Sequence, residues 1–473
     1  MVKPTFLFKL PHPAFDEWGM DMTPAFTAGQ YVGDDLWVSV LEGGPRQYVD
    51  LDTAATSSAS VAVNRAVQEF LPWYASVHRG AGIKSQITSA RYEEAREIIV
   101  RFVGGDPATH LALFPRNTTE ALNLLAYRLR LTKGDVVVTT AVEHHANLLP
   151  WQRHARLRTV EVDERGTFDV AAVEAALDEY PKPRVLAISG GSNVTGWVPD
   201  LRGIAAAARQ RGVLVVVDGA QLVPHRPVDI TALGVDVIAF SGHKMYAPYG
   251  AGALVAPRKL FATGEPFLVG GGAVQAVSFD DVVWADGPDR DDAGSPNVLG
   301  VVALTASADE LSSDGWSSVL AHEEHLVRGL DSELASVPGL RRLGPVTGDR
   351  LPVAAFNLEG VPHGLLAARL ANEYAIGTRS GCFCAHPYMG RLLGLSEAEV
   401  EQFHADVRAG ARHRLPGAVR VSANRQTYLT DIPLLGQALR AIAATPEGAE
   451  LYELDGRGDF VPRSRSLVGA QAG

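Results

Sequence analysis

The chain has 473 residues, of which 46% are hydrophobic and 21% are charged, and its formal net charge is -11. At roughly 150 residues per domain, this length predicts two to four domains or lobes with a large buried core. A small stapled scaffold and a disordered regulator are therefore excluded. The acidic balance and the scattered arginines argue against nonspecific DNA binding, which needs clustered Lys and Arg.

The chain contains only two cysteines, Cys382 and Cys384. Two cysteines cannot build a disulfide framework, and a bond between residues this close in sequence would be strained. A structural zinc site needs four ligands, and the neighbouring sequence does not offer the other two. The pair therefore indicates a reducing compartment and needs another explanation.

The two ends of the sequence carry no clear targeting signal. The first apolar stretch is interrupted by Pro4 and Pro11, so it is a poor signal peptide. No apolar segment approaches the roughly 20 residues that a membrane span needs. Residues 456–473 are typical of a frayed polar tail. We expect a soluble cytoplasmic protein.

Short apolar runs alternate with amphipathic or Ala-rich segments between residues 48 and 315. This alternation, with continuous apolar strands, predicts an α/β domain around a mainly parallel, buried sheet. Ligands of such sheets bind beyond the carboxyl ends of the strands. The strands are expected at HLALFP, DVVVTT, RTVEVD, RVLAISG, VLVVVDG, DVIAFSG and GALVAP, and the clearest helices between them at TTEALNLLAYRLRL and LRGIAAAARQRG.

A Gly-rich, acidic stretch follows, and the chain then resumes with a second pattern. A helix is expected at 320–337 and strands near 351–358 and 417–422, which predicts a smaller α+β domain over residues 316–455. Residues 1–47 are expected to pack on this domain or to cross to it.

Lys244 follows the apolar strand DVIAFSG in a Gly-rich loop, and Asp218 ends the strand VLVVVD. Lys244 could be an ordinary surface lysine, or it could bond covalently to the aldehyde of a cofactor. Asp218 could cap a turn, or it could pair with a protonated pyridine nitrogen. Each signal is weak alone, and the two in this order favour the cofactor.

At this point the sequence resembles the class V aminotransferase-like family of fold type I pyridoxal-phosphate enzymes, and most closely its cysteine desulfurase and selenocysteine lyase branch. The resemblance runs from about Tyr48 to Asp431. It implies a large pyridoxal-phosphate-binding domain, a smaller C-terminal domain, and a homodimer with shared active sites. It rests on nine ordered motifs: SVHRGAGIKS, FPRNTTEALNLLA, VEHHANLLPW, ISGGSNVTGWVPD, VVVDGAQ, SGHKMYAPYGAG, DAGSPN, RSGCFCAHP and VRVS.

The resemblance also assigns residues that contact the ring of the cofactor. It implies that Lys244 bonds to the cofactor and moves protons at the substrate Cα, and that Asp218 pairs with the pyridine nitrogen. Gln221 would bond the phenolic oxygen, and Asn193 would lie beside the cofactor. His144 would stack on the ring and is a candidate acid–base group because histidine titrates near neutrality.

The phosphate of the cofactor has its own set of matching residues. Thr118 and Thr119 begin a helix whose N–H groups and hydroxyls suit a dianion, although simple capping explains them too. Ser241 and His243 match further phosphate ligands of the family. Ser295 matches a residue that reaches the phosphate from the partner subunit.

The cysteine loop carries the reaction-specific part of the resemblance. In the family a cysteine thiolate attacks the sulfur of the bound substrate cysteine, leaving alanine and an enzyme persulfide. That cysteine aligns with Cys384, while Cys382 stands where the family often has histidine. Arg379 and Arg420 match positions that bind the substrate carboxylate, with Arg420 the favoured clamp. The alternative is that both cysteines are merely small buried residues.

Two further observations bear on the substrate and its acceptor. His78 matches a histidine near the active site of relatives. The stretch between Cys384 and Arg420 is longer than in plain desulfurases and, together with GCFC, is similar to the desulfurase domain of molybdenum cofactor sulfurases. We expect a cysteine desulfurase that passes sulfur to an acceptor protein. Alternatives are selenocysteine lyase, β-elimination of a C–S bond, epimerisation, transamination, or a scaffold that has lost catalysis.

Overall fold

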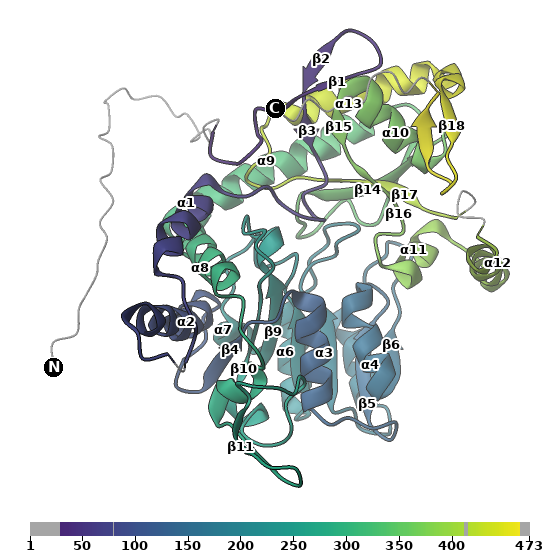
Figure 1. The fold of residues 1–473 in the computed structure, drawn as a ribbon. Coiled ribbons are helices and arrows are strands. Elements are labelled where there is room, and N and C mark those ends of the chain that lie inside the picture. Colours follow the sequence, from purple (N-terminus) through teal and green to yellow (C-terminus); the bar gives the residue numbers. More distant parts are fainter. Residues whose placement is uncertain (1–28, 79, 411–414, 464–473) are drawn as a thin grey trace.

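The computed structural model describes residues 29–78, 80–410 and 415–463 (Figure 1). A large domain lies in the lower half of the view and a smaller domain above it, with the N-terminal residues of the described chain reaching the small domain. The fold class expected from the sequence is confirmed. The expected positions of residues 1–28 and 464–473 lie outside the described residues.

A seven-stranded sheet forms the centre of the large domain, in the order β4-β10-β9-β8-β7-β5-β6. The strands from β9 to β6 run parallel, while β10 is antiparallel to both of its neighbours. All seven expected strands are present: β4 (His110–Leu113), β5 (Val136–Thr140), β6 (Arg156–Val160), β7 (Val185–Ser189), β8 (Leu214–Asp218), β9 (Val237–Ser241) and β10 (Gly252–Pro257).

Helices cover both faces of this sheet, which explains why its central strands, such as β5, β7 and β9, are buried along their whole length. Alternate strand residues enter one core with α2, α5, α6 and α8, and the others enter a second core with α3 and α4, which lie in front of the sheet in Figure 1. The helices are α1 (Val61–Phe70), α2 (Ile83–Phe102), α3 (Thr118–Arg128), α4 (Leu149–His154), α5 (Val170–Asp178), α6 (Leu201–Gln210), α7 (Ile230–Leu233) and α8 (Val298–Ser313).

The small domain is an antiparallel sheet with helices packed on it. Its order is β13-β14-β17-β16, and a core of leucine, isoleucine and valine joins it to α9, α10 and α13. The elements are α9 (Trp316–Ala335), β13 (Leu340–Leu343), β14 (Val353–Leu358), α10 (His363–Tyr374), β15 (Ile376–Gly377), β16 (Arg379–Gly381), β17 (Ala418–Ser422) and α13 (Asp431–Ala444).

The N-terminal segment contributes to the small domain before it enters the large one. The hairpin of β1 (Trp37–Ser39) and β2 (Pro45–Gln47) is followed by β3 (Val49–Asp50), which pairs in parallel with β15. Leu51 is fully buried in the small-domain core, although the sequence pattern assigns it to the large domain. The backbone between β3 and α1 therefore crosses from one domain to the other.

Two peripheral segments complete the fold. The stretch between Cys384 and Arg420 forms α11 (His386–Leu393) and α12 (Glu397–Arg408), and β11 (Val274–Val277) pairs with β12 (Val282–Trp284) in the Gly-rich stretch. The sequence predicts a polar tail from residue 456, but β19 (Phe460–Pro462) pairs with β18 (Tyr452–Leu454) because Phe460 packs on the small-domain core. None of the helices within the described residues is both long and apolar enough to cross a membrane.

Candidate active site

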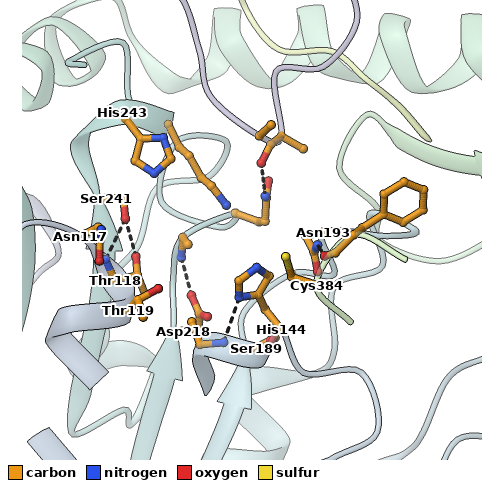
Figure 2. Close-up of a pocket in the computed structure, with 18 of the residues that line it drawn as sticks. Asn117, Thr118, Thr119, His144, Ser189, Asn193, Asp218, Ser241, His243 and Cys384 are labelled. Carbon is orange, nitrogen blue, oxygen red and sulfur yellow. Dashed lines mark hydrogen bonds between the residues drawn. The ribbon is translucent and has the colours of Figure 1, made fainter. Parts of the chain in front are cut away.

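A cavity of about 210 Å³ opens at the carboxyl ends of β7, β8 and β9, with the loop after β16 forming its far wall (Figure 2). This is the edge where parallel α/β sheets bind their ligands. Twelve residues expected at the site line it: Thr118, Thr119, His144, Asn193, Asp218, Gln221, Ser241, His243, Lys244, Arg379, Cys384 and Arg420.

Lys244 and Asp218 both line this cavity, at or just after the ends of the neighbouring strands β9 and β8. Lys244 ends the short 3₁₀ helix η3 (Gly242–Lys244), directly after β9. Burial lowers its pKa to about 8, with Arg420 adding to the effect and Asp218 opposing it. A substantial fraction of the amine is then neutral near pH 8 and able to act as a nucleophile. Burial raises the pKa of Asp218, whose carboxylate also accepts a hydrogen bond from the N–H of Ala220 at 3.0 Å.

Small hydroxyl side chains gather at the start of α3. The N–H of Thr118 donates to Ser241 Oγ at 2.8 Å, and the two hydroxyls lie 2.7 Å apart. Asn117 caps the helix by accepting from the N–H of Glu120 at 3.0 Å. A helix N-terminus flanked by hydroxyl groups suits a phosphate group. Burial and Lys244 together lower the pKa of His243 to about 4, so its ring is neutral at this end of the cavity.

His144 presents a neutral ring to the cavity. Its Nδ1 accepts a hydrogen bond from the N–H of Ala146 at 3.0 Å, which places the ring proton on Nε2. Burial, assisted by Lys244, lowers its pKa to about 3. The ring can therefore stack on a planar ligand and donate from Nε2.

Two amide side chains of the site hold backbone groups. Gln221 Nε2 donates to the carbonyl of Ala54 at 2.8 Å. Asn193 Nδ2 donates to the carbonyl of Phe383 at 2.7 Å. The second bond joins the large domain to the cysteine loop, a contact that sequence reasoning did not find.

The cysteine loop is held by the large domain. The N–H of His145 donates to the carbonyl of Cys384 at 2.8 Å, next to the bond from Asn193 to Phe383. Phe383 and Cys384 both have φ of +54°, a left-handed conformation that is costly for residues with a side chain. The thiol of Cys384 is exposed. The loop is thus fixed and the sulfur remains accessible.

Cys382 is placed differently from its neighbour. Its side chain is partly buried, and Sγ donates to the carbonyl of Pro416 at 3.0 Å. Burial raises the pKa of Cys382 to about 11, so the group stays a thiol at neutral pH. This environment is unsuited to a nucleophile, which must be a thiolate.

The two arginines of the site differ in burial. The side chain of Arg420 is 3% exposed and donates to Asp52 Oδ1 at 2.7 Å and to the carbonyl of Asn193 at 3.0 Å. The side chain of Arg379 is 49% exposed and meets the other oxygen of Asp52 at 3.3 Å. Nε of Arg420 is buried without a hydrogen-bond partner among the described residues. Asp52 thus holds both cations at the cavity, and sequence reasoning missed it.

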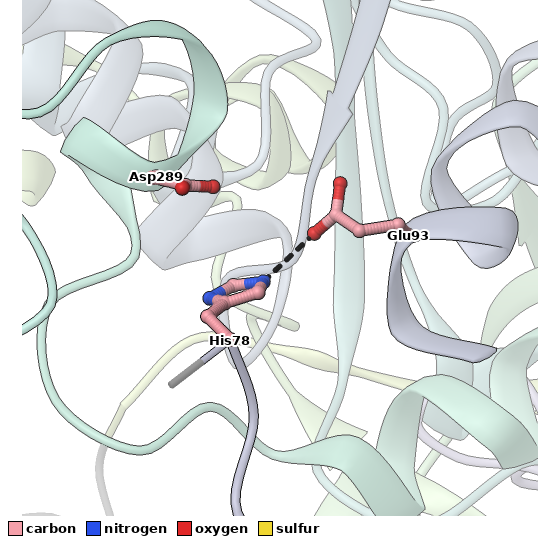
Figure 3. A group of neighbouring side chains, drawn as sticks. All are labelled: His78, Glu93 and Asp289. Atoms are coloured by element: carbon pink, nitrogen blue, oxygen red, sulfur yellow. Dashed lines mark hydrogen bonds and ion pairs between the residues drawn. The ribbon is translucent and has the colours of Figure 1, made fainter. Parts of the chain in front are cut away.

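His78 and Ser295 lie away from this cavity in the single chain. Both line a separate, open depression of about 500 Å³, which also includes Asp289. His78 Nε2 lies 2.9 Å from Glu93 Oε1, and Asp289 is close to the pair (Figure 3). The structure therefore brings twelve of the fourteen expected residues together and leaves these two in a second group.

Comparison with known proteins decides the family. Residues 49–432 match the family described as aminotransferase class-V. The chain belongs to that family. It is 39% identical over 368 residues to a probable cysteine desulfurase 2 of Mycobacterium leprae, covering 75% of this chain and 86% of the relative. It is also 39% identical over 361 residues to a cysteine desulfurase of Dickeya dadantii, covering 74% and 86% respectively.

Solved structures agree with this family. An apo cysteine desulfurase from Thermococcus onnurineus is 30% identical with a TM-score of 0.74, covering 84% of this chain and 95% of that one. The S-sulfonic acid form of a cysteine desulfurase from Escherichia coli is 32% identical with a TM-score of 0.71, covering 83% and 94%. The family is one of pyridoxal-phosphate-dependent enzymes, and the fold type expected from the sequence is confirmed.

The donor groups of the cavity fit that cofactor. The buried carboxylate of Asp218 suits a cationic ring nitrogen, the amine of Lys244 suits an aldehyde, and the hydroxyls at the start of α3 suit a phosphate. Gly242 leaves the room that this arrangement needs, because a Cβ there would lie 2.7 Å from the carbonyl of Ala251. When bound, pyridoxal phosphate withdraws electrons from the Cα of an amino acid.

Sequence reasoning also missed residues of the cavity, although the local sequence around some of them indicated their positions. Asn117 stands three residues before Glu120, the spacing of a helix cap, and its side chain borders the cavity. Ser189 ends β7 and also lines the cavity. Asp52 follows β3 but carries no local pattern that would reveal its two arginine partners.

Proposed function

We propose that the chain is a cysteine desulfurase that uses pyridoxal phosphate to convert L-cysteine into L-alanine and leaves the sulfur on Cys384 as a persulfide. The observation that carries the proposal is the exposed thiol of Cys384 at the rim of the cavity that contains Lys244. The 39% identity to proteins named cysteine desulfurase supports it.

Each role in the reaction falls to a residue of the cavity. Arg420, with Arg379 beside it, binds the substrate carboxylate. Lys244 holds the cofactor and moves the proton at the substrate Cα, while Asp218 keeps the cofactor ring nitrogen protonated. The thiolate of Cys384 then attacks the substrate sulfur. A sulfur–sulfur bond forms as the carbon–sulfur bond breaks, and the electron pair stays with the carbon skeleton, which takes up a proton and becomes alanine.

Replacement of each cysteine by serine tests the proposal. In L-cysteine with a reductant, we expect wild type and Cys382→Ser to release alanine and sulfide in equal amounts. Cys384→Ser should release neither above background while retaining the absorbance of bound cofactor. Undiminished sulfide from Cys384→Ser would refute the assignment of the nucleophile. Pyruvate and ammonia from wild type would indicate β-elimination instead, and a parallel assay with L-selenocysteine compares sulfur with selenium.

We also propose that the active protein is a homodimer in which Ser295 and His78 serve the partner subunit's cavity. Their separation from the cavity of their own chain supports this arrangement. Light scattering should give twice the chain mass, and Ser295→Ala should weaken cofactor retention in the dimer. A monomer with full activity would refute the shared site.

The sulfur of Cys384 needs an acceptor, which we propose to be a thiol of another protein. The reaction regenerates the free thiol of Cys384, so the proposed compartment is the reducing cytoplasm. Transfer of radiolabelled sulfur from Cys384 to a thiol protein, and its absence in Cys384→Ser, would test this step.

A further inference from the structure

Glu143 is a fully buried carboxylate that precedes His144 in the chain and bonds Ser189, two residues that line the cavity. Its side chain is 1% exposed, and no cationic side chain is among its hydrogen-bond partners in the described residues. Burying a carboxylate without a cationic partner costs free energy, so its presence at this place needs an explanation. The roles assigned above do not use it.

Four hydrogen bonds converge on this carboxylate. Its Oε1 accepts from the Thr140 hydroxyl at 2.6 Å and from the N–H of Ser189 at 3.0 Å. Its Oε2 accepts from Asn147 Nδ2 at 2.6 Å and from the Ser189 hydroxyl at 2.6 Å. The donors come from the end of β5, the end of β7 and the 3₁₀ helix η2 (His145–Asn147). The carboxylate therefore joins three segments that surround the cavity.

The carboxylate of Glu143 accepts a hydrogen bond from β7 beyond the point where the pairing of β5 with β7 ends. Between β5 and β7 the paired residues are Val137 with Val185 and Val138 with Leu186. Nearer the cavity the N–H of Ser189 donates to Glu143 instead. On its other side Ser189 pairs with Asp218. The position of Asp218 is thus connected through Ser189 to Glu143.

The loop that carries His144 is fixed by the same group. Asn147 is held at both ends of its amide, because its Oδ1 accepts from Trp151 Nε1 at 3.0 Å while its Nδ2 donates to Glu143. His144 stands between Glu143 and η2, and its ring orientation depends on the N–H of Ala146 in that helix. Movement of Glu143 would displace both the ring and its tautomer-fixing donor.

We propose that Glu143 is a positioning residue, whose carboxylate fixes the His144 ring and the β7–β8 edge against the cofactor. Both of its oxygens face obligatory N–H donors, from Ser189 and from Asn147, so only an acceptor at both positions satisfies the site. Burial raises the pKa of Glu143 to about 7, and its hydrogen bonds oppose that shift, so the carboxylate is the main form at pH 8.

Glutamine is the informative replacement. Its NH₂ group would point at the N–H of Ser189 in one orientation and at Asn147 Nδ2 in the other, so one donor is always left facing another. Asn147 cannot turn to relieve this without losing its bond from Trp151. Glu143→Gln therefore disturbs the floor of the cavity with almost no change in volume.

Glu323→Gln is a matched control. Glu323 lies in α9 and is also 1% exposed. Its carboxylate bonds His225 at 2.6 Å and Arg226 at 2.9 Å, and it does not line the cavity. Loss of a buried carboxylate should lower the melting temperature of both variants. Only Glu143→Gln should change the site.

The experiment compares both variants and His144→Ala at pH 8, and its kinetic part rests on the proposed desulfurase activity. For Glu143→Gln we expect kcat for alanine to fall at least about tenfold with KM within about threefold. The absorbance maximum of the bound cofactor should shift, a readout that does not need turnover. Glu323→Gln should keep wild-type kcat and absorbance. The double variant Glu143→Gln/His144→Ala should lose less activity than the sum of the two single losses, because Glu143 acts partly through His144.

Three results would overturn the proposal. These are wild-type kcat and absorbance in Glu143→Gln, equal losses of kcat in the Glu323→Gln control, and fully additive losses in the double variant. If wild type makes no alanine, the proposed function fails, while the absorbance shift still tests Glu143 independently.

Discussion

Replacement of Arg420 by lysine tests which arginine binds the substrate carboxylate. The guanidinium of Arg420 already uses one nitrogen for Asp52 and another for the carbonyl of Asn193, and its Nε has no partner within the described part of the chain. A lysine keeps the charge but cannot hold Asp52 and Asn193 and also form a bidentate contact with a carboxylate. Losing one charge-assisted hydrogen bond to the substrate costs about 1.5–3 kcal/mol, or roughly a 10- to 150-fold loss of kcat/KM.

Arg379→Lys is the matched comparison, because Arg379 is half exposed and its ion pair with Asp52 is longer. An exposed pair contributes about 0.2–1 kcal/mol, so this change should lower kcat/KM by no more than about fivefold. Steady-state formation of alanine over a range of L-cysteine concentrations gives both values. We expect the loss in Arg420→Lys to arise mainly from KM. A larger rise of KM in Arg379→Lys than in Arg420→Lys, at equal melting temperatures, would refute the reasoning.

Further predictions concern the lysine, the second cysteine and a glycine. With the pKa of Lys244 lowered to about 8, capture of pyridoxal phosphate by cofactor-free protein should speed up about tenfold per pH unit below 8 and level off above it; a rise that continues to pH 10 would contradict this. Cys382→Ala should retain at least about half of the alanine formation, because a thiol with a pKa of about 11 is not the nucleophile. Loss of all activity in this variant would contradict the assignment of Cys384 as the only nucleophile. Gly242→Ala should lower the free energy of unfolding in urea by about 1–3 kcal/mol, because its Cβ would meet the carbonyl of Ala251; unchanged stability would show that the loop can shift.

Much of the large domain could be predicted because its determinants are local. A strand buried on both faces has to be apolar along most of its length, and such runs mark the central strands β5, β7, β8, β9 and β10. The cofactor could be predicted because Asp218 and Lys244 follow apolar runs that form neighbouring strands. The resemblance then supplied residues that no local pattern marks, among them Asn193 and Gln221.

The contacts that sequence reasoning missed join residues far apart in the chain. Asp52 pairs with Arg420 across 368 positions, and no periodicity links the two. By its place in the sequence Leu51 belongs to the large domain, and only the pairing of β3 with β15 shows that it lies in the small one. Phe460 sits in a polar segment, and its packing on the small-domain core depends on tertiary structure alone. Glu143 has an inconspicuous sequence context because its partners lie on three separate segments.

The hydrogen bonds that hold the cysteine loop have a consequence for sulfur delivery. Asn193 and His145 each bond a carbonyl of that loop, and each such bond contributes about 0.5–1.5 kcal/mol. Swinging Cys384 out of the cavity would break both, which disfavours an outward loop. If Cys384 carries the sulfur as proposed, the sulfur would stay where it is formed, and a recipient thiol would have to reach it along the exposed side of Cys384. Any such recipient must carry its thiol on an extended or protruding segment.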